Sequence, residues 1–265
     1  VVWSAGNIEQ INGSTAMMIE NQSGSLFDIQ GDLTLGAGSI SGNYDNTLTF
    51  VNQAGGELRR SAGTGTTLLG WQSDGDNGQN FNLQNNGTVN IQTGTVRIGL
   101  AGTPAASTGT FGVSGGAVLD YGSGSHTFTG VTQSGAGALR LSGGAITFTG
   151  ASTATDLQLA GGTLTVSGGG TVGASNLAFS SGTLAGAGEL SVTGASSSWS
   201  GGTLSGNLRV ASGGTLAMNG GVKNIGNGSL TNQGTVVWSA GNIEQINGST
   251  AMTIMNQSGS LFDIQ

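Results

Sequence analysis

The residues with the clearest potential for chemistry lie in one polar stretch, Gln72-Ser-Asp74-Gly-Asp76-Asn77-Gly-Gln-Asn80. Asp74, Asp76 and Asn77 place oxygen ligands at short intervals, which is how a calcium-binding loop begins. The stretch lacks the bidentate glutamate and the rest of the spacing that such a loop needs. The sequence therefore gives a weak Ca²⁺ candidate here, with a plain polar turn as the alternative. No other metal site and no cofactor are expected.

The other reactive side chains do not form a catalytic set. Glycoside cleavage needs two neighbouring carboxylates with tuned pKa values, and the 13 acidic residues offer no clustered pair beyond Asp74 and Asp76. Lyase chemistry would need basic residues near a metal, and the chain has only six Lys and Arg residues. His126, the single histidine, is expected on the surface beside a strand. We therefore expect no catalytic residue and no enzyme activity.

Two further groups of residues have binding chemistry. The tryptophans could stack on sugar rings, but they lie in alternating strand-like stretches, which favours packing in the core or at its edge. They are Trp3, Trp71, Trp199 and Trp238. The pair Arg59-Arg60 could bind an anion, and a solvated corner is the favoured interpretation.

These side chains must be positioned by strands, because the composition excludes long helices. The 265 residues include 53 Gly, and only 7% of them are charged. Each interior glycine costs a helix about 1 kcal/mol relative to alanine. The 35% hydrophobic content is too high for a disordered chain. Short strands joined by glycine turns are the remaining class of structure.

A unit of about 20 residues recurs in the second half of the chain. Leu139-Arg-Leu141-Ser-Gly-Gly-Ala-Ile146-Thr-Phe148 is followed by Leu157-Gln-Leu159-Ala-Gly-Gly-Thr-Leu164-Thr-Val166. Apolar and small polar residues alternate, as in a strand with one buried face, and the Gly-Gly pair breaks the strand. The pattern predicts an all-β fold, a parallel β-solenoid (β-helix) with about 20 residues per coil.

A longer repeat is superimposed on the short one. The segment 1–30 returns at 236–265 with two differences, Met18 against Thr253 and Glu20 against Met255. In an array, each copy meets the same neighbours and can stay the same. We therefore expect residues 1–235 to be one complete tandem repeat of a continuous solenoid and 236–265 the start of the next. The chain would be a window of a longer protein, or else a trimmed chain that carries the overlap deliberately.

Asparagine recurs where a corner is expected before a strand. Because asparagine tolerates left-handed backbone and can bond its own backbone, corners stacked on one edge could form an asparagine ladder. The residues are Asn21, Asn52, Asn85, Asn232 and Asn256. The first half of the chain is less regular, and we expect its polar stretches Gln72–Asn80 and Gly99–Thr110 to leave the solenoid as loops.

The alternating units, the stretches NQGTVVW and NGSTAM, and the tandem copies resemble the passenger and repeat regions of giant bacterial surface proteins, the filamentous-haemagglutinin-like and autotransporter-type adhesins. This resemblance implies a right-handed β-solenoid that is exported from a bacterium and displayed as a rod or fibre, often adhesive. It implies no catalytic residues. Copies this similar are unusual for such adhesins, which favours a filament.

Charge and hydropathy limit the kinds of partner that the chain can bind. A net charge of −7 argues against nucleic acid, and the absence of a long apolar run argues against a membrane span. We expect a structural segment of an extracellular filament at the bacterial cell surface, whose partners are neighbouring repeats of the same chain. Each repeat would contain about 12 coils and extend roughly 57 Å at about 4.8 Å per coil. Filaments that associate sideways would be further partners. The alternative is an adhesin passenger that binds surface glycans through the two loops.

Overall fold

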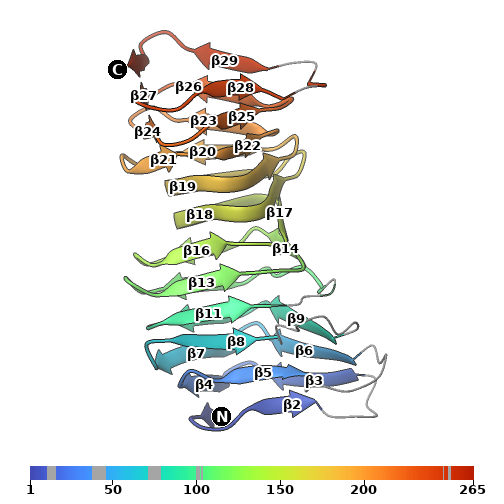
Figure 1. Cartoon of the computed structure of the whole chain (residues 1–265). Helices are drawn as coiled ribbons and strands as arrows, with labels where there is room; N and C mark the ends of the chain where they lie inside the picture. Colours follow the sequence, from blue (N-terminus) through green and yellow to red (C-terminus); the bar gives the residue numbers. More distant parts are fainter. Residues whose placement is uncertain are drawn as a thin grey trace. The chain divides into compact units, whose positions relative to one another are not determined.

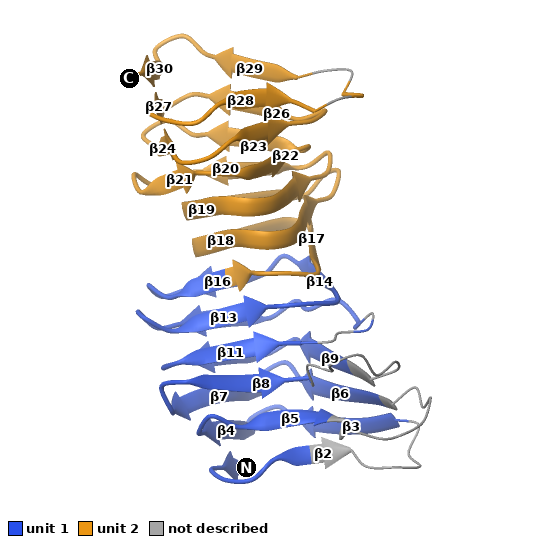
Figure 2. Cartoon of the chain, viewed as in Figure 1, with its two compact units in different colours: residues 1–139 blue, residues 140–265 orange. Residues whose placement is uncertain are grey.

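A computed structural model describes residues 1–10, 16–37, 46–70, 79–99, 102, 104–246, 248–249 and 252–265. Over these ranges every regular element is a β-strand. The chain divides into two compact units, residues 1–139 and residues 140–265 (Figure 2). Within the described ranges no helix is long and apolar enough to cross a membrane.

Short strands make up the first unit. They are β1 (Val2–Trp3), β2 (Ile8–Gln10), β3 (Ala16–Asn21), β4 (Leu26–Gln30), β5 (Thr34–Ala37), β6 (Asn46–Asn52), β7 (Glu57–Ala62), β8 (Thr66–Leu69), β9 (Gln79–Asn85), β10 (Thr88–Ile91), β11 (Thr95–Ile98), β12 (Thr110–Val113), β13 (Val118–Tyr121), β14 (Ser125–Thr129) and β15 (Thr132–Ser134). The boundary between the units falls inside β16 (Ala138–Leu141).

The second unit contains two long strands among short ones. Its strands are β17 (Ala145–Thr149), β18 (Ala151–Val166), β19 (Thr171–Ala185), β20 (Glu189–Val192), β21 (Ser197–Trp199), β22 (Gly202–Leu204), β23 (Asn207–Val210), β24 (Thr215–Met218), β25 (Lys223–Ile225), β26 (Ser229–Asn232), β27 (Thr235–Trp238), β28 (Ile243–Gln245), β29 (Thr253–Asn256) and β30 (Leu261–Ile264). The long strands β18 and β19 run through positions that separate short strands occupy in other coils.

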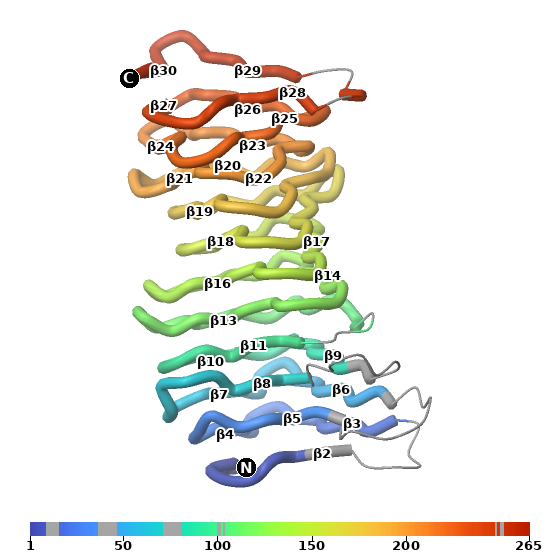
Figure 3. The backbone as a smooth tube through the Cα atoms, viewed as in Figure 1, coloured from blue at the N-terminus to red at the C-terminus, as the bar shows by residue number. Residues whose placement is uncertain are grey.

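Within each unit the backbone winds in coils, and each strand pairs in parallel with a strand of the next coil (Figures 1 and 3). In the first unit one column of paired residues runs through Asp28, Arg59, Asn90, Gly112 and Ser134. Strands β3, β6 and β9 form a second sheet on another side of these coils. The predicted parallel β-solenoid is confirmed, and the hand of the coil stays a prediction.

The coil length varies along the chain, and the longest coils lie in the first unit. In the second unit each coil is close to the length that the sequence pattern predicts, because one paired column runs through Ala151, Thr171, Glu189, Asn207 and Ser229. In the first unit, Asp28 pairs with Arg59, which lies 31 positions further along the chain, and Arg59 pairs with Asn90. The predicted coil length is wrong for these coils, because extra residues separate β5 from β6 and β8 from β9.

The core lies inside the coils, and every second residue of a strand points into it. In β10, Val89 and Ile91 are buried, whereas Thr88 is exposed. Stacked coils place like residues above each other: the rings of Phe179 and Trp199 are parallel, with centroids 5.5 Å apart. Burying these side chains stabilises the fold by roughly 2 kcal/mol each, and parallel hydrogen bonds between coils add to it.

Close stacking also explains the glycines at the corners. Gly186 has φ +98°, and a Cβ there would lie 2.0 Å from the carbonyl oxygen of Val166 in the preceding coil. Gly213 has φ +82° with open space around it. The first glycine is required by both its neighbour and its backbone, and the second by its backbone alone.

Candidate functional site

The weak calcium candidate at Asp74, Asp76 and Asn77 lies outside the described residues. Over the ranges that are described, no group of three or more His, Cys, Asp or Glu side chains is placed to hold a metal ion. The predicted loop Gln72–Asn80 extends two residues too far toward the C-terminus, because the backbone of Gln79 and Asn80 already belongs to β9. This strand pairs in parallel with β6, so the chain has rejoined the coil there.

The second predicted loop, Gly99–Thr110, also returns to the coil early. Ser107 forms an isolated parallel bridge with Phe128, and its Oγ accepts a hydrogen bond of 3.0 Å from the backbone N–H of Asn85. Pro104 cannot donate to a strand ladder, and no strand is assigned to the described part of this stretch before Ser107. The described chain therefore rejoins the coil at Ser107, three residues before the predicted end of the loop.

The expectation of a surface position for His126 is wrong. Its side chain is 3% exposed and meets the ring of Tyr121 edge to face, with centroids 4.6 Å apart. Its Nε2–H donates to the carbonyl oxygen of Ser123 at 3.1 Å. Burial lowers the pKa of His126 to about 4, so the ring is neutral at physiological pH. The imidazole is part of the core.

The pair Arg59-Arg60 is not a solvated corner open to anions. Arg59 donates to both oxygens of Asp28 at 3.1 and 2.8 Å. Arg60 is fully buried and bonds Asp32, the carbonyl oxygens of Gly65 and Thr93, and the hydroxyl of Thr67. Each guanidinium therefore links neighbouring coils, because each bonds at least one acceptor of a coil next to its own.

Lys223 is a second buried cation, absent from the candidates that the sequence suggests. Its Nζ donates to the carbonyl oxygens of Gly221 and Ala240, each at 2.9 Å. Loss of solvent lowers the pKa of Lys223. The alternation of buried and exposed residues along the strand could have predicted this burial, because Lys223 lies on the same strand face as the buried Ile225. Like Arg60, it connects neighbouring coils.

The described tryptophans pack as the favoured interpretation predicts. Trp3 is 6% exposed and Trp199 is fully buried, whereas Trp71 lies outside the described residues. The indole N–H of Trp3 donates to the carbonyl oxygen of Gly6 at 2.8 Å. Trp238, its copy, donates to the carbonyl oxygen of Gly241 at the same distance. Neither forms an exposed stacking surface for sugars.

The two copies of the repeated segment have the same register. Trp3 pairs with Ile29 in the first copy, and Trp238 pairs with Ile264 in the second. Their side-chain bonds match as well: Gln30 donates to Asp28 at 2.9 Å, and Gln265 donates to Asp263 at 2.8 Å. The two positions that differ, 18/253 and 20/255, carry exposed side chains in both copies. The inward side of the coil is thus identical.

The asparagine ladder is present at these copies. Asn21 Nδ2 donates to Asn52 Oδ1, and Asn52 Nδ2 donates to Asn85 Oδ1, each at 2.8 Å. In the second unit, Asn232 Nδ2 donates to Asn256 Oδ1 at 2.8 Å. Each of these donor amides also bonds a backbone carbonyl oxygen, which fixes its orientation. All three amides therefore donate to the coil that follows in the sequence.

Asn21 and Asn256 are the outermost asparagines of the two described ladders. Among the described residues, Asn21 Oδ1 receives no donor, and Asn256 Nδ2 finds no acceptor. In the second unit Asn232 Nδ2 donates to Asn256 Oδ1, and in the first unit Asn52 Oδ1 accepts from Asn21 Nδ2.

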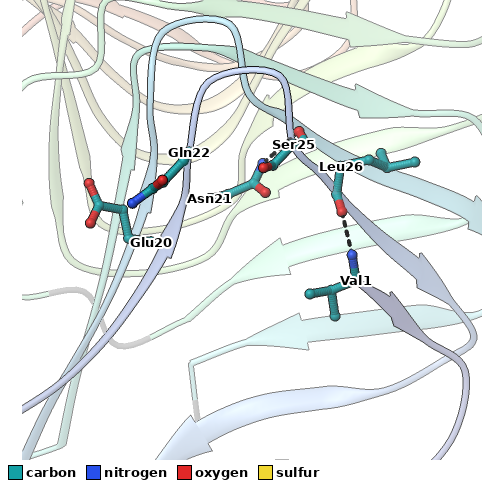
Figure 4. A pocket seen from close by; sticks show the side chains of 6 residues that line it. All are labelled: Val1, Glu20, Asn21, Gln22, Ser25 and Leu26. Atoms are coloured by element: carbon teal, nitrogen blue, oxygen red, sulfur yellow. Dashed lines mark hydrogen bonds between the residues drawn. The ribbon is translucent and has the colours of Figure 1, made fainter.

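A hollow of about 340 Å³ lies at the first end (Figure 4). It is lined by Val1, Glu20, Asn21, Gln22, Ser25 and Leu26. In the second copy the same place is covered by residues 229–235. There, Asn232 Nδ2 donates to the carbonyl oxygen of Leu261 at 2.8 Å, and the Leu261 N–H donates to the carbonyl oxygen of Gly234 at 3.0 Å.

The hollow thus lies on the face that, in the second copy, pairs with the strands before it. Comparison of the chain with protein-family models, with curated proteins and with solved structures finds no match.

Proposed function

We propose that the chain is a structural segment of a long extracellular filament built from tandem β-solenoid repeats. The observation that carries this proposal is the equivalence of the two copies: within the described residues, 236–265 repeat the strand register of residues 1–30, the bond from the tryptophan to a glycine carbonyl oxygen and the bond from the last glutamine to the aspartate. A repeat whose start follows its own end in the same register can be continued without limit.

In such an array the asparagine ladder spans each junction. Asn232 and Asn256 would be followed by the copies of Asn52 and Asn85 in the next repeat, since Asn21 donates to Asn52 and Asn52 donates to Asn85 in the first copy. The amide of each donor then has both a side-chain and a backbone acceptor across the seam. The junction would be as well bonded as the interior of a repeat.

The location at a bacterial cell surface belongs to this proposal and comes from the resemblance to exported adhesins. A chain without cysteine gains nothing from an oxidising environment, so its stability outside the cell would come from strand pairing and core burial. The function would be mechanical, to extend from the cell as a stiff fibre.

The native full-length protein provides the test, by electron cryo-microscopy of the assembled particles. In the first unit Ser134 lies five coils from Val2 by the paired registers, and in the second unit Ser229 lies four coils from Ala151. If the proposed filament is continuous, its expected period is about ten coils, or roughly 50 Å at about 4.8 Å per coil, which is shorter than the value that uniform short coils would give.

A strand spacing of about 4.8 Å seen together with that longer period would support the filament. Separate short particles without the period would contradict it and favour the alternative, an adhesin passenger with a finite solenoid. In that case, glycan binding that is lost on shortening the loop at Gly99–Thr110 would identify the binding surface.

A further inference from the structure

We propose that Asn219 is a site of spontaneous deamidation, which converts it to isoaspartate and aspartate while the chain stays folded. Asn219 begins the corner that joins β24 to β25, and Gly220 and Gly221 follow it. An asparagine followed by glycine carries its own nucleophile, because the backbone nitrogen of the glycine lies within reach of the side-chain carbonyl carbon. The inference does not depend on the proposed filament, and its test leaves that proposal untouched.

The reaction needs only water besides the chain. The backbone nitrogen of Gly220 bonds to Cγ of Asn219, and the side-chain amide leaves as ammonia with the proton that this nitrogen gives up, so a cyclic imide forms. Water then opens one of the imide carbonyls. One opening gives aspartate, and the other gives isoaspartate, in which the backbone runs through the former side chain. The only lysine of the sequence, Lys223, is fully buried, so no lysine of this sequence competes with water for the imide.

The surroundings of Asn219 leave the attack unhindered. Gly220 is exposed and has φ +70°, and among the described residues its backbone N–H donates to no acceptor. The side-chain amide of Asn219 likewise has no hydrogen-bond partner within the described part of the chain. Glycine accepts the change in backbone angles that ring closure requires. The nucleophile and the carbon that it attacks are therefore both available without breaking a hydrogen bond.

The pair Asn86-Gly87 provides a comparison inside the same chain. The N–H of Gly87 donates to the carbonyl oxygen of Asn52 at 3.1 Å. The side-chain Oδ1 of Asn86 accepts from the Thr108 hydroxyl at 3.0 Å. Ring closure at this pair has to break both bonds first, which adds to its barrier. We therefore expect the fold to protect Asn86.

The pair Asn227-Gly228 is held by packing. Gly228 is buried, and a Cβ there would lie 2.6 Å from the carbonyl oxygen of Gly206 in the preceding coil. Its backbone has no room to turn toward the asparagine unless the corner moves away from that coil. The other Asn-Gly pairs of the sequence include residues outside the described ranges. Of the three pairs that are fully described, Asn219 is the one that is both exposed and unbonded at its glycine.

Isoaspartate would disturb the corner, because it adds an atom to the backbone between two bonded points. The N–H of Asn219 donates to the carbonyl oxygen of Trp199 at 3.2 Å, and the N–H of Gly221 donates to the carbonyl oxygen of Ser200 at 2.8 Å. A longer backbone between these two donors does not fit both acceptors at their present spacing. Aspartate keeps the original backbone and adds only a charge. The two products should therefore differ in stability, with isoaspartate the lower.

The experiment measures site-resolved deamidation of the folded chain and of the chain unfolded in urea. Both samples are kept in mildly alkaline buffer, and each Asn-Gly pair is followed by mass spectrometry of its peptide. In urea, Asn86, Asn219 and Asn227 should react at similar rates. In the folded chain, Asn86 and Asn227 should slow by about tenfold or more, while Asn219 keeps most of its unfolded rate. Protection of Asn219 as strong as that of Asn86 would overturn the proposal.

Two variants complete the test. Asn219→Gln keeps a side-chain amide but needs a larger ring, so deamidation at this position should cease while the rates at Asn86 and Asn227 stay unchanged. Asn219→Asp supplies the aspartate product. The isoaspartate form, separated by ion exchange, should have a lower urea midpoint than both the wild type and Asn219→Asp. Aspartate as the sole product, or equal midpoints of the two product forms, would contradict the role given to isoaspartate.

Discussion

Asp28 and Arg59 lie opposite each other in paired strands β4 and β7, and the guanidinium donates to both carboxylate oxygens at 3.1 and 2.8 Å. The same aspartate recurs at Asp263 in the second copy, where Gln265 Nε2 donates to it at 2.8 Å. The Asp28–Arg59 pair is a bond between neighbouring coils and adds to the strand pairing that holds them in register.

This ion pair predicts a loss of stability in acid. The hydrogen bonds from Arg59 lower the pKa of Asp28 from 3.8 to about 2. Its contribution to stability is present above pH 4 and is lost as the pH falls toward 2, because the unfolded chain takes up the proton first. We expect Asp28→Asn to lower the urea midpoint at pH 7 and to match the wild type near pH 2.

The control for this pair is Glu244→Gln, which removes an exposed carboxylate that accepts from Asn242 at 3.2 Å. Its urea midpoint at pH 7 should stay near the wild-type value. An equal loss in both variants would show that the Arg59 pair contributes nothing beyond a generic surface charge.

His126 predicts a second pH dependence at higher pH. Its pKa is lowered by burial to about 4, while the unfolded chain protonates near 6.5. The native state therefore loses stability as the pH falls from about 6.5 to about 4, by roughly 3 kcal/mol in total. Equilibrium unfolding in urea at pH 7.5 and 4.5 measures this loss.

His126→Phe is the informative variant for this prediction. The phenyl ring keeps the edge contact with Tyr121, whose ring centroid is 4.6 Å away, and cannot be protonated. Its stability should change little between pH 7.5 and 4.5. A variant that loses as much as the wild type would place the acid sensitivity elsewhere.

The asparagine ladder predicts a large effect from a small change. Asn52 is fully buried and donates through Nδ2 to Asn85 Oδ1 and to the carbonyl oxygen of Thr88. Asn52→Asp replaces this donor with an anionic acceptor facing two other acceptors. We expect a loss of several kcal/mol in the free energy of unfolding, about 3 or more.

Asn86→Asp is the control for the ladder. Asn86 Oδ1 accepts from the Thr108 hydroxyl at 3.0 Å, and aspartate keeps that acceptor. Its unfolding free energy should stay within about 0.5 kcal/mol of wild type. If both variants lose the same free energy of unfolding, the orientation of the amides in the ladder does not affect stability.

Glycine positions predict a graded series of alanine variants. Gly168→Ala should be nearly neutral, because its φ is not left-handed and the nearest atom is 3.8 Å away. Gly213→Ala introduces only the strain of left-handed backbone, about 1–2 kcal/mol. Gly186→Ala adds a clash with the carbonyl oxygen of Val166 and should lose more than either. Thermal unfolding of the three variants tests this order.

The fold and the ladder could both be predicted from the sequence. Alternation with a Gly-Gly break predicts the strands around Leu157 and Leu159, and these residues are buried. Asparagine before each corner predicts the ladder, because coils of a solenoid must stack like positions. Coil length in the first unit was not predictable in the same way, since the longer coils, in which Asp28 pairs with Arg59 and Arg59 with Asn90, leave no short-range period to detect.

The burial of charged and titratable side chains is the main feature of the core that the sequence did not predict. His126 and Phe128 alternate with more exposed residues, and Arg60 shares a strand face with Leu58. The period of two therefore places all of them inside. The sequence could not supply the acceptors: Arg60 is tolerated because the carbonyl oxygen of Thr93 and the carboxylate of Asp32 face it from the neighbouring coils.

The shared register of Trp3 with Ile29 and of Trp238 with Ile264 has a consequence for how such a protein varies in length. If the repeats are joined in an array, removing or inserting one whole repeat at any position returns every remaining coil to neighbours of the kind it had before. Fibre length is then free to change in whole repeats without a folding penalty, so lineages that gain or lose copies by recombination keep a foldable protein at every step.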